Sequence, residues 1–119
     1  MVNDLNLGIN LGYWTRGPED HTAAVVAADE LGYAVRALQS NHEGVLIDWV
    51  HELRTSCVGL IVNAGGYTHT SVALRDALET VEAPVIEVHI SDIHAREDFR
   101  HHSYVEQVAA AQIAGHGIA

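Results

Sequence analysis

Val85-Ile-Glu-Val-His-Ile-Ser91 alternates apolar and polar side chains, and a period of two is the pattern of a β-strand. Strands that lie between helices in a parallel sheet are usually apolar on both faces. Three polar side chains on one face, those of Glu87, His89 and Ser91, therefore need a reason. Open α/β sheets bind ligands beyond the carboxyl ends of their strands, so we interpret this strand end as a site.

Helical and extended patterns alternate along the chain and predict a doubly wound parallel α/β sheet with right-handed crossovers. Helices are expected over about residues 22–31, 40–53 and 70–80, with a helical turn at 95–104. Strands are expected at 33–38, 58–62, 85–90 and 109–113, after a first strand within residues 1–12. Ser40 or Asn41 is expected to cap the second helix, where Trp49 is interpreted as core.

The length and composition fit one domain over residues 1–119, because 119 residues with 48% hydrophobic content support a single core. No apolar run approaches the roughly 20 residues that cross a bilayer, and the N-terminus lacks a secretory signal pattern. We therefore expect a soluble, cytoplasmic protein. The single cysteine, Cys57, excludes an intrachain disulfide and a thiolate metal cluster.

The charge balance is strongly acidic, with 16 acidic and 6 basic side chains and a formal net charge of -10. Such a balance argues against nucleic acid and anionic membranes as partners. All the basic side chains are arginines, and without lysine a Schiff base cannot form. The i, i+4 spacing of Arg96 and Arg100 predicts one helical face that suits a carboxylate ligand.

Glu87 and His89 project from the same strand face, with Cα atoms about 6.5 to 7 Å apart. A carboxylate beside an imidazole orients the ring and favours its protonated form, which suits a general acid. The alternative is a buried pair that serves only as a satisfied core contact.

The segment from Asn63 to His69 follows a strand, and its glycines let backbone N–H groups approach a small ligand. His69 is either a ligand-binding residue or a hydrogen bonder at a helix start. A metal site from His94, His101 and His102 is disfavoured, because metal-ligand spacing and cysteine partners are lacking. We therefore expect no metal.

Three long motifs carry a resemblance that covers about residues 31–118. They are Gln39-Ser-Asn-His-Glu-Gly-Val-Leu-Ile-Asp48, Asn63-Ala-Gly-Gly-Tyr-Thr-His-Thr-Ser-Val-Ala-Leu-Arg-Asp76 and Glu87-Val-His-Ile-Ser-Asp-Ile-His-Ala-Arg-Glu-Asp-Phe-Arg100. In this order they closely resemble the type II 3-dehydroquinate dehydratases. The resemblance implies a flavodoxin-like α/β/α fold, no cofactor, trimers packed into dodecamers, and conversion of 3-dehydroquinate to 3-dehydroshikimate in the shikimate pathway of aromatic amino acid biosynthesis or in quinate breakdown.

The resemblance also implies roles for individual residues. His89 matches the acid that protonates the departing C1 hydroxyl, Glu87 matches the group that holds it, and Asn6 matches the asparagine that positions a water against the enolate. The matches to substrate-binding residues are Asn63, His69, Ile90, Ser91 and Arg100, together with Arg96 near the site and Asp76, which reaches the site of a neighbouring subunit.

This sequence departs from the family in the region of the catalytic base. In the family, an arginine after the first strand is followed by a tyrosine whose phenolate removes the C2 proton. Arg16 matches the arginine, but the next tyrosine is Tyr33, so Tyr13 is the nearby candidate for the base. Compared with the family, the first strand is abbreviated and the final helix is missing. The missing tyrosine in the shortened region motivates an alternative function as a non-catalytic anion-binding or assembly module.

Overall fold

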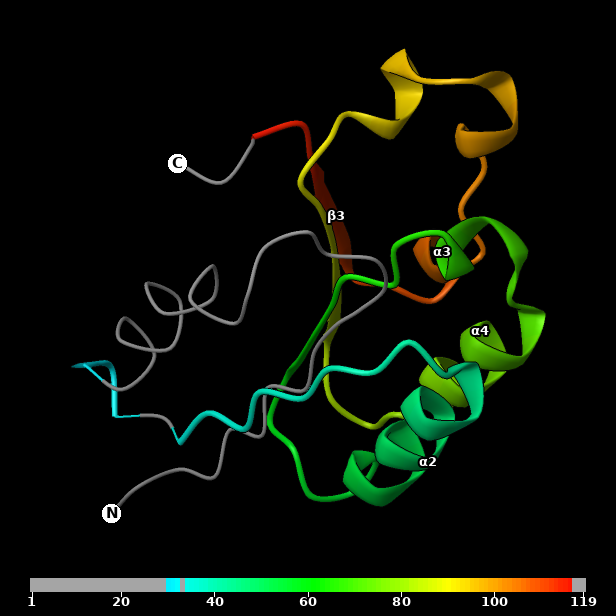
Figure 1. The fold of residues 1–119 in the computed structure, drawn as a ribbon. Coiled ribbons are helices and arrows are strands. Elements are labelled where there is room, and N and C mark those ends of the chain that lie inside the picture. The colour runs from blue at the N-terminus through cyan, green and yellow to red at the C-terminus, as the bar shows by residue number, and fades with distance from the viewer. Residues whose placement is uncertain (1–29, 33, 117–119) are drawn as a thin grey trace.

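The computed structural model describes residues 30–32 and 34–116. Within these ranges β1 (Leu60–Val62), β2 (Val85–His89) and β3 (Ala111–Ala114) form a parallel sheet in the order β1-β2-β3. The crossover from β1 to β2 carries two helices, as Figure 1 shows. The parallel α/β sheet predicted from the sequence is confirmed, with strands that are shorter than expected.

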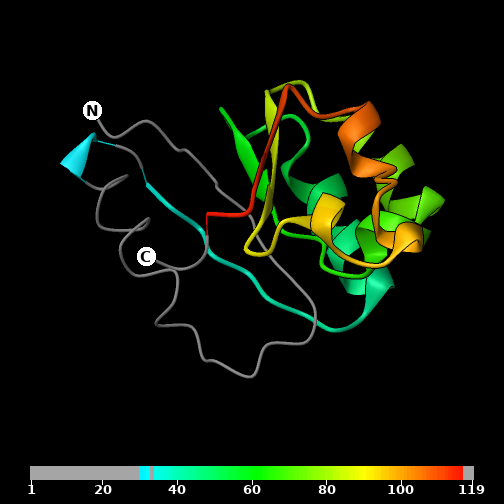
Figure 2. The ribbon, with the colours of Figure 1, turned by 90° about the horizontal axis from the view of Figure 1, so that it is seen from above.

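The helices of the described ranges are α2 (Glu43–Leu53), α3 (Tyr67–Thr70) and α4 (Val72–Glu79). They gather on one side of the sheet, where α2 and α4 pack against each other (Figures 1 and 2). The helix α4 begins close to the start expected at residue 70, and Ser71 caps it, because its hydroxyl accepts a hydrogen bond from the Leu74 N–H. None of these described helices combines the length and the apolar content that a membrane crossing requires.

The predicted cap of α2 is wrong by one or two residues. His42 is the N-cap and makes no side-chain capping bond. The Ser40 hydroxyl accepts a hydrogen bond from the His42 N–H instead, so it stabilises the turn before the helix.

The core lies between α2, α4 and the facing side of the sheet. Its buried side chains are Leu46, Val50 and Leu53 from α2, Leu74, Ala77 and Leu78 from α4, and Leu60, Val62, Ala64, Val85 and Val105 from the strands and loops. Trp49 is partly buried and packs against this cluster, as predicted. The core therefore holds β2 rigidly against the helices, and β2 carries the residues of interest.

The strand predicted over 33–38 is not present in the described residues. Residues 34–39 form an irregular segment, and none of their side chains is buried. The largely apolar residues of this segment fit a strand, but a strand also needs a hydrogen-bonded neighbour, and the three strands of the described sheet do not include this segment. The first predicted strand and most of the helix at 22–31 lie outside the described residues.

The helical turn predicted over 95–104 is instead a pair of separate 3₁₀ turns, η2 (Ile93–Ala95) and η3 (Asp98–Arg100). Arg96 has an extended backbone with φ −103° and ψ −164°, which interrupts the helical path between them. Because the side chains at 94–99 are all exposed, no apolar stripe packs a continuous helix here. A third turn, η4 (Val105–Gln107), leads to β3.

Candidate active site

Glu87 and His89 form a buried pair on the core-facing side of β2. Their side chains are 0% and 5% exposed, and the burial of β2 alternates as a strand with one inward face requires. His89 Nε2 lies 2.6 Å from Glu87 Oε2. The pairing predicted from the sequence is therefore present in the structure.

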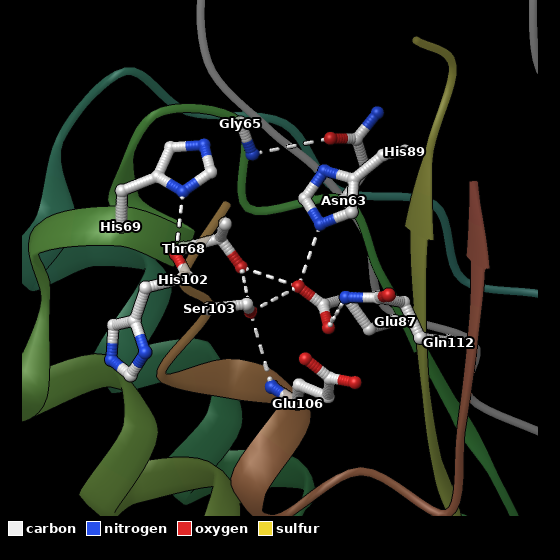
Figure 3. Close-up of polar contacts among 10 residues, drawn as sticks. All are labelled: Asn63, Gly65, Thr68, His69, Glu87, His89, His102, Ser103, Glu106 and Gln112. Atoms are coloured by element: carbon white, nitrogen blue, oxygen red, sulfur yellow. Dashed lines mark hydrogen bonds and ion pairs between the residues drawn. The ribbon is translucent and has the colours of Figure 1, made fainter. Parts of the chain in front are cut away.

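The Glu87 carboxylate accepts hydrogen bonds from three further side chains, which come from three separate segments (Figure 3). Thr68 Oγ1 donates to Oε2 over 2.6 Å, and Ser103 Oγ donates to the same oxygen. Gln112 Nε2 donates to the other oxygen, Oε1, over 2.8 Å. Among the described residues, the carboxylate is thus surrounded by neutral donors and one histidine.

The direction of these bonds is fixed by the other contacts of Ser103. The Glu106 N–H donates to the Ser103 hydroxyl oxygen, so the hydroxyl proton is available for Glu87. Thr68 Oγ1 and Ser103 Oγ lie 2.9 Å apart and converge on one carboxylate oxygen. This arrangement stabilises an ionised Glu87.

The pKa of Glu87 reflects two opposing effects. Burial alone would raise the pKa, because a charged carboxylate loses its hydration. The hydrogen bonds from His89, Ser103, Thr68 and Gln112 outweigh this cost and lower the pKa of Glu87 from 4.5 to about 2. Glu87 is therefore an anion throughout the physiological pH range.

The ionised Glu87 fixes the tautomer of His89. A carboxylate can only accept, so Nε2 of His89 must carry a proton. The other ring nitrogen, Nδ1, has no hydrogen-bond partner among the described residues. When the ring is in its imidazolium form, Nδ1 also carries a proton, and that proton can pass to a bound molecule. This is the arrangement of a general acid braced by a carboxylate.

Asn63 lies directly after β1 and is 8% exposed. Its Oδ1 accepts from the Gly65 N–H over 3.1 Å, and Gly65 has the positive φ of 57° that this turn requires. Because the oxygen is engaged, the amide Nδ2 is left to donate to a ligand (Figure 3). Asn63 therefore suits an oxygen-rich ligand.

His69 lies in α3, and its ring is nearly parallel to that of His89, with centroids 6.4 Å apart. Its Nδ1 lies 2.7 Å from the carbonyl oxygen of His102, which can only accept, so Nδ1 carries the proton. His69 is therefore consistent both with a hydrogen bonder at a helix start and with a ligand-binding residue. One nitrogen serves the local fold, while Nε2 stays available as an acceptor.

A cavity of about 290 Å³ joins His69 to Arg100. Its other lining residues are Asn41, Gly66, Tyr67, Thr70 and Phe99. Neither His89 nor Asn63 lines this cavity, but His69 does, and its ring is stacked with the ring of His89.

The two arginines do not share a helical face, because η2 ends before Arg96. They flank one carboxylate instead: Arg100 Nε is hydrogen bonded to Glu97 Oε2, and Arg96 Nε lies 4.0 Å from the same oxygen. The resulting hydrogen bond and charge lower the pKa of Glu97. The predicted positive spot on a helix is therefore wrong, although Arg100 does reach the cavity of His69.

The other predicted residues are more scattered. Ile90 is half-buried just past β2, whereas Ser91 lies beyond the strand and is exposed, so it does not extend the face of Glu87 and His89. Asp76 on α4 is exposed and bound by Arg75. Asn6, Tyr13 and Arg16 lie outside the described residues. Within the described ranges, His, Cys, Asp and Glu side chains nowhere gather in threes as a metal ion would require.

Sequence reasoning missed the three neutral donors to Glu87. A signal existed for Gln112, because it is the polar residue in an otherwise apolar predicted strand, Ala109 to Ile113. Thr68 and Ser103 are separated by 35 positions and meet only in the folded chain. No local spacing predicts that meeting.

Comparison with known proteins places the chain among relatives of one kind. The family model described as "Dehydroquinase class II" matches residues 15–119. The 3-dehydroquinate dehydratase of Rhodopseudomonas palustris is 49% identical over 128 aligned positions, which cover 99% of this chain and 83% of the relative. That of Cereibacter sphaeroides is 50% identical over 107 positions, which cover 90% of this chain and 72% of the relative.

Solved structures agree with this grouping. The type II dehydroquinase of Butyrivibrio crossotus superposes with a TM-score of 0.87 at 34% identity and covers 97% of this chain and 90% of its own. The predicted flavodoxin-like α/β class is thereby confirmed. The family match, the level of identity and the shared fold lead to one conclusion: the chain belongs to the class II dehydroquinase family.

Proposed function

We propose that this protein is a hydro-lyase that removes water from 3-dehydroquinate and yields 3-dehydroshikimate. The observation that carries the proposal is the buried Glu87–His89 pair at the carboxyl end of β2. It occurs in a chain whose relatives at about 50% identity are named 3-dehydroquinate dehydratase. This is the type of site, at the sheet edge, where open α/β folds bind ligands.

His89 acts as the general acid. In the reaction, a base removes the C2 proton to give an enolate, and collapse of the enolate expels the C1 hydroxyl. Nδ1 of His89 gives its proton to that hydroxyl, which leaves as water. Glu87 stays ionised and keeps the ring oriented, because four donors stabilise its charge.

Binding of the substrate falls to groups around this acid. Asn63 Nδ2 and His69 Nε2 supply a donor and an acceptor for a carboxylate and ring hydroxyls. Arg100 supplies a cation at the cavity that His69 also lines. Ile90, Ser91 and Arg96 complete this set on the grounds of the resemblance.

The base and the enolate-stabilising group are assigned from the resemblance alone. We infer that Tyr13 removes the C2 proton with Arg16 beside it, and that Asn6 holds the water that stabilises the enolate. A phenol ionises at about pH 10, so a neighbouring guanidinium is required for the phenolate to form near neutrality.

The alternative of a non-catalytic binding module has less support. It rests on the lack of a tyrosine between Arg16 and Tyr33, whereas relatives at about 50% identity carry the name of the enzyme. Among the described residues, His89 Nδ1 has no hydrogen-bond partner, and a purely structural contact would not require an available nitrogen. The comparisons therefore favour the enzyme.

The proposal extends to assembly. We infer a trimer-based oligomer in which Asp76 reaches the site of a neighbouring subunit. Its carboxylate is 62% exposed, and Arg75 binds it over 2.8 Å, so the group is presented on the surface of α4 rather than buried in its own subunit.

The test of the proposed function is direct. Purified protein is mixed with 3-dehydroquinate, and the absorbance of the conjugated enone product is followed. We expect turnover without added metal or cofactor. Calorimetric binding without any product would contradict the enzyme and support the binding module.

A further inference from the structure

Gln112 and Glu87 are direct neighbours on adjacent parallel strands. The β2–β3 register pairs Glu87 with Gln112, and side chains paired in this way project from the same face of a sheet. The Gln112 amide lies 2.8 Å from Glu87 Oε1 and is half-buried. The contact is therefore a consequence of strand pairing rather than of a flexible surface side chain.

The two oxygens of Glu87 have different surroundings. Oε2 accepts hydrogen bonds from Thr68, Ser103 and His89. Among the described residues, Gln112 is the donor to Oε1 (Figure 3). A carboxylate can rotate about its Cγ–Cδ bond, and a half-turn exchanges its two oxygens. The Gln112 donor on Oε1 gives the group a second point of attachment, which resists this rotation.

We propose that Gln112 is a positioning residue for the dehydration, which fixes the plane of the Glu87 carboxylate so that Oε2 stays directed at His89 Nε2. It acts through Glu87 and His89 and does not touch the substrate. This inference rests on the proposed function, since it assigns Gln112 a part in delivering the acidic proton of His89.

The first kinetic test is Gln112→Met. This substitution keeps about the length and volume of the side chain but removes the amide that donates to Glu87 Oε1. We expect kcat to fall by about tenfold, which is less than the 10²–10⁴-fold that a general acid contributes, and KM to change by less than about twofold. Gln107→Met is the matched control, because Gln107 is exposed on η4. It is expected to retain wild-type kinetics.

A second variant, Gln112→Glu, separates positioning from folding. The introduced carboxyl group would face Glu87, and two adjacent carboxylates cannot both ionise without a large cost. When the introduced group is protonated it can donate to Oε1 as the amide does. His89 is the titratable side chain that contacts Glu87, and the donors Thr68 and Ser103 do not titrate.

For Gln112→Glu we therefore expect kcat relative to wild type to recover as the pH is lowered and to fall as it is raised. Gln112→Met should show a constant ratio. A merely structural role would alter the thermal midpoint of unfolding without this pH dependence.

The outcomes separate the inference from the proposed function. If the wild type does not dehydrate 3-dehydroquinate, the proposed function fails. If the wild type is active, and Gln112→Met keeps wild-type kcat while Gln112→Glu follows the wild-type pH profile, the role of Gln112 is refuted and the proposed function stands.

Discussion

His89 Nε2 lies 2.6 Å from Glu87 Oε2, and His89 Nδ1 has no partner among the described residues. The histidine therefore has one nitrogen that is held and one that is available. Because Glu87 is ionised and buried, the held nitrogen must be the donor, and the proton for chemistry must leave from Nδ1.

Thr68→Val should weaken both the fold and the reaction. The change removes the buried hydroxyl that donates to Glu87 Oε2, and a hydrogen bond to a charged group contributes about 1.5–3 kcal/mol. We expect a lower midpoint of urea unfolding and a lower kcat. Thr68→Ser keeps the hydroxyl and is the control, so equal kcat losses in the two variants would refute the role of the hydrogen bond.

Acid should destabilise the protein through Glu87. A carboxyl group with a pKa lowered from 4.5 to about 2 stabilises the fold fully above pH 4.5 and loses this contribution as the pH falls toward 2. The full contribution is roughly 3 kcal/mol. Glu87→Gln lacks it, so the difference in thermal midpoint between wild type and variant should shrink at about pH 3. A difference that is independent of pH would contradict the assignment.

Asn63→Asp should impair binding more than chemistry. The substitution keeps the oxygen that accepts from the Gly65 N–H, so the turn after β1 is preserved. It replaces the free amide donor with an acceptor that carries negative charge, which repels an anionic substrate. We expect KM to rise by about tenfold or more, with a smaller change in kcat. Unchanged KM would mean that Asn63 does not face the substrate.

Tyr13→Phe tests the proposed base. The phenol is the group that would remove the C2 proton, and its loss should lower kcat by about 10²-fold or more. Tyr33→Phe is the control, since Tyr33 follows the region that matches the family's base. Wild-type rates in Tyr13→Phe would remove Tyr13 from the mechanism.

The parts of the fold that depend on local pattern were predictable from the sequence. The alternation in Val85–His89, the apolar stripe of α2 and the Ser71 cap of α4 each follow from short-range spacing, and each is present. The strand predicted at 33–38 is not present among the described residues, because an apolar segment becomes a strand only when another strand pairs with it.

The site divides in the same way. The Glu87–His89 pair is two residues apart on one strand, so the sequence alone predicts it. The donors to Glu87 come from positions as distant as Thr68 and Ser103, and only the packing of α3 against the segment after η3 brings them together. The prediction that Arg96 and Arg100 share a helical face was wrong. The side chains at 94–99 are exposed, so no buried stripe stabilises a continuous helix there.

The most direct test of the account follows two reactions of His89→Ala in heavy water. Exchange of the C2 proton reports the base, and loss of the C1 hydroxyl reports the acid. If Nδ1 of His89 is the acid, the variant should bind 3-dehydroquinate and still exchange the C2 proton, while dehydration falls by about 10²–10⁴-fold. Dehydration at the wild-type rate in the folded variant would contradict the account.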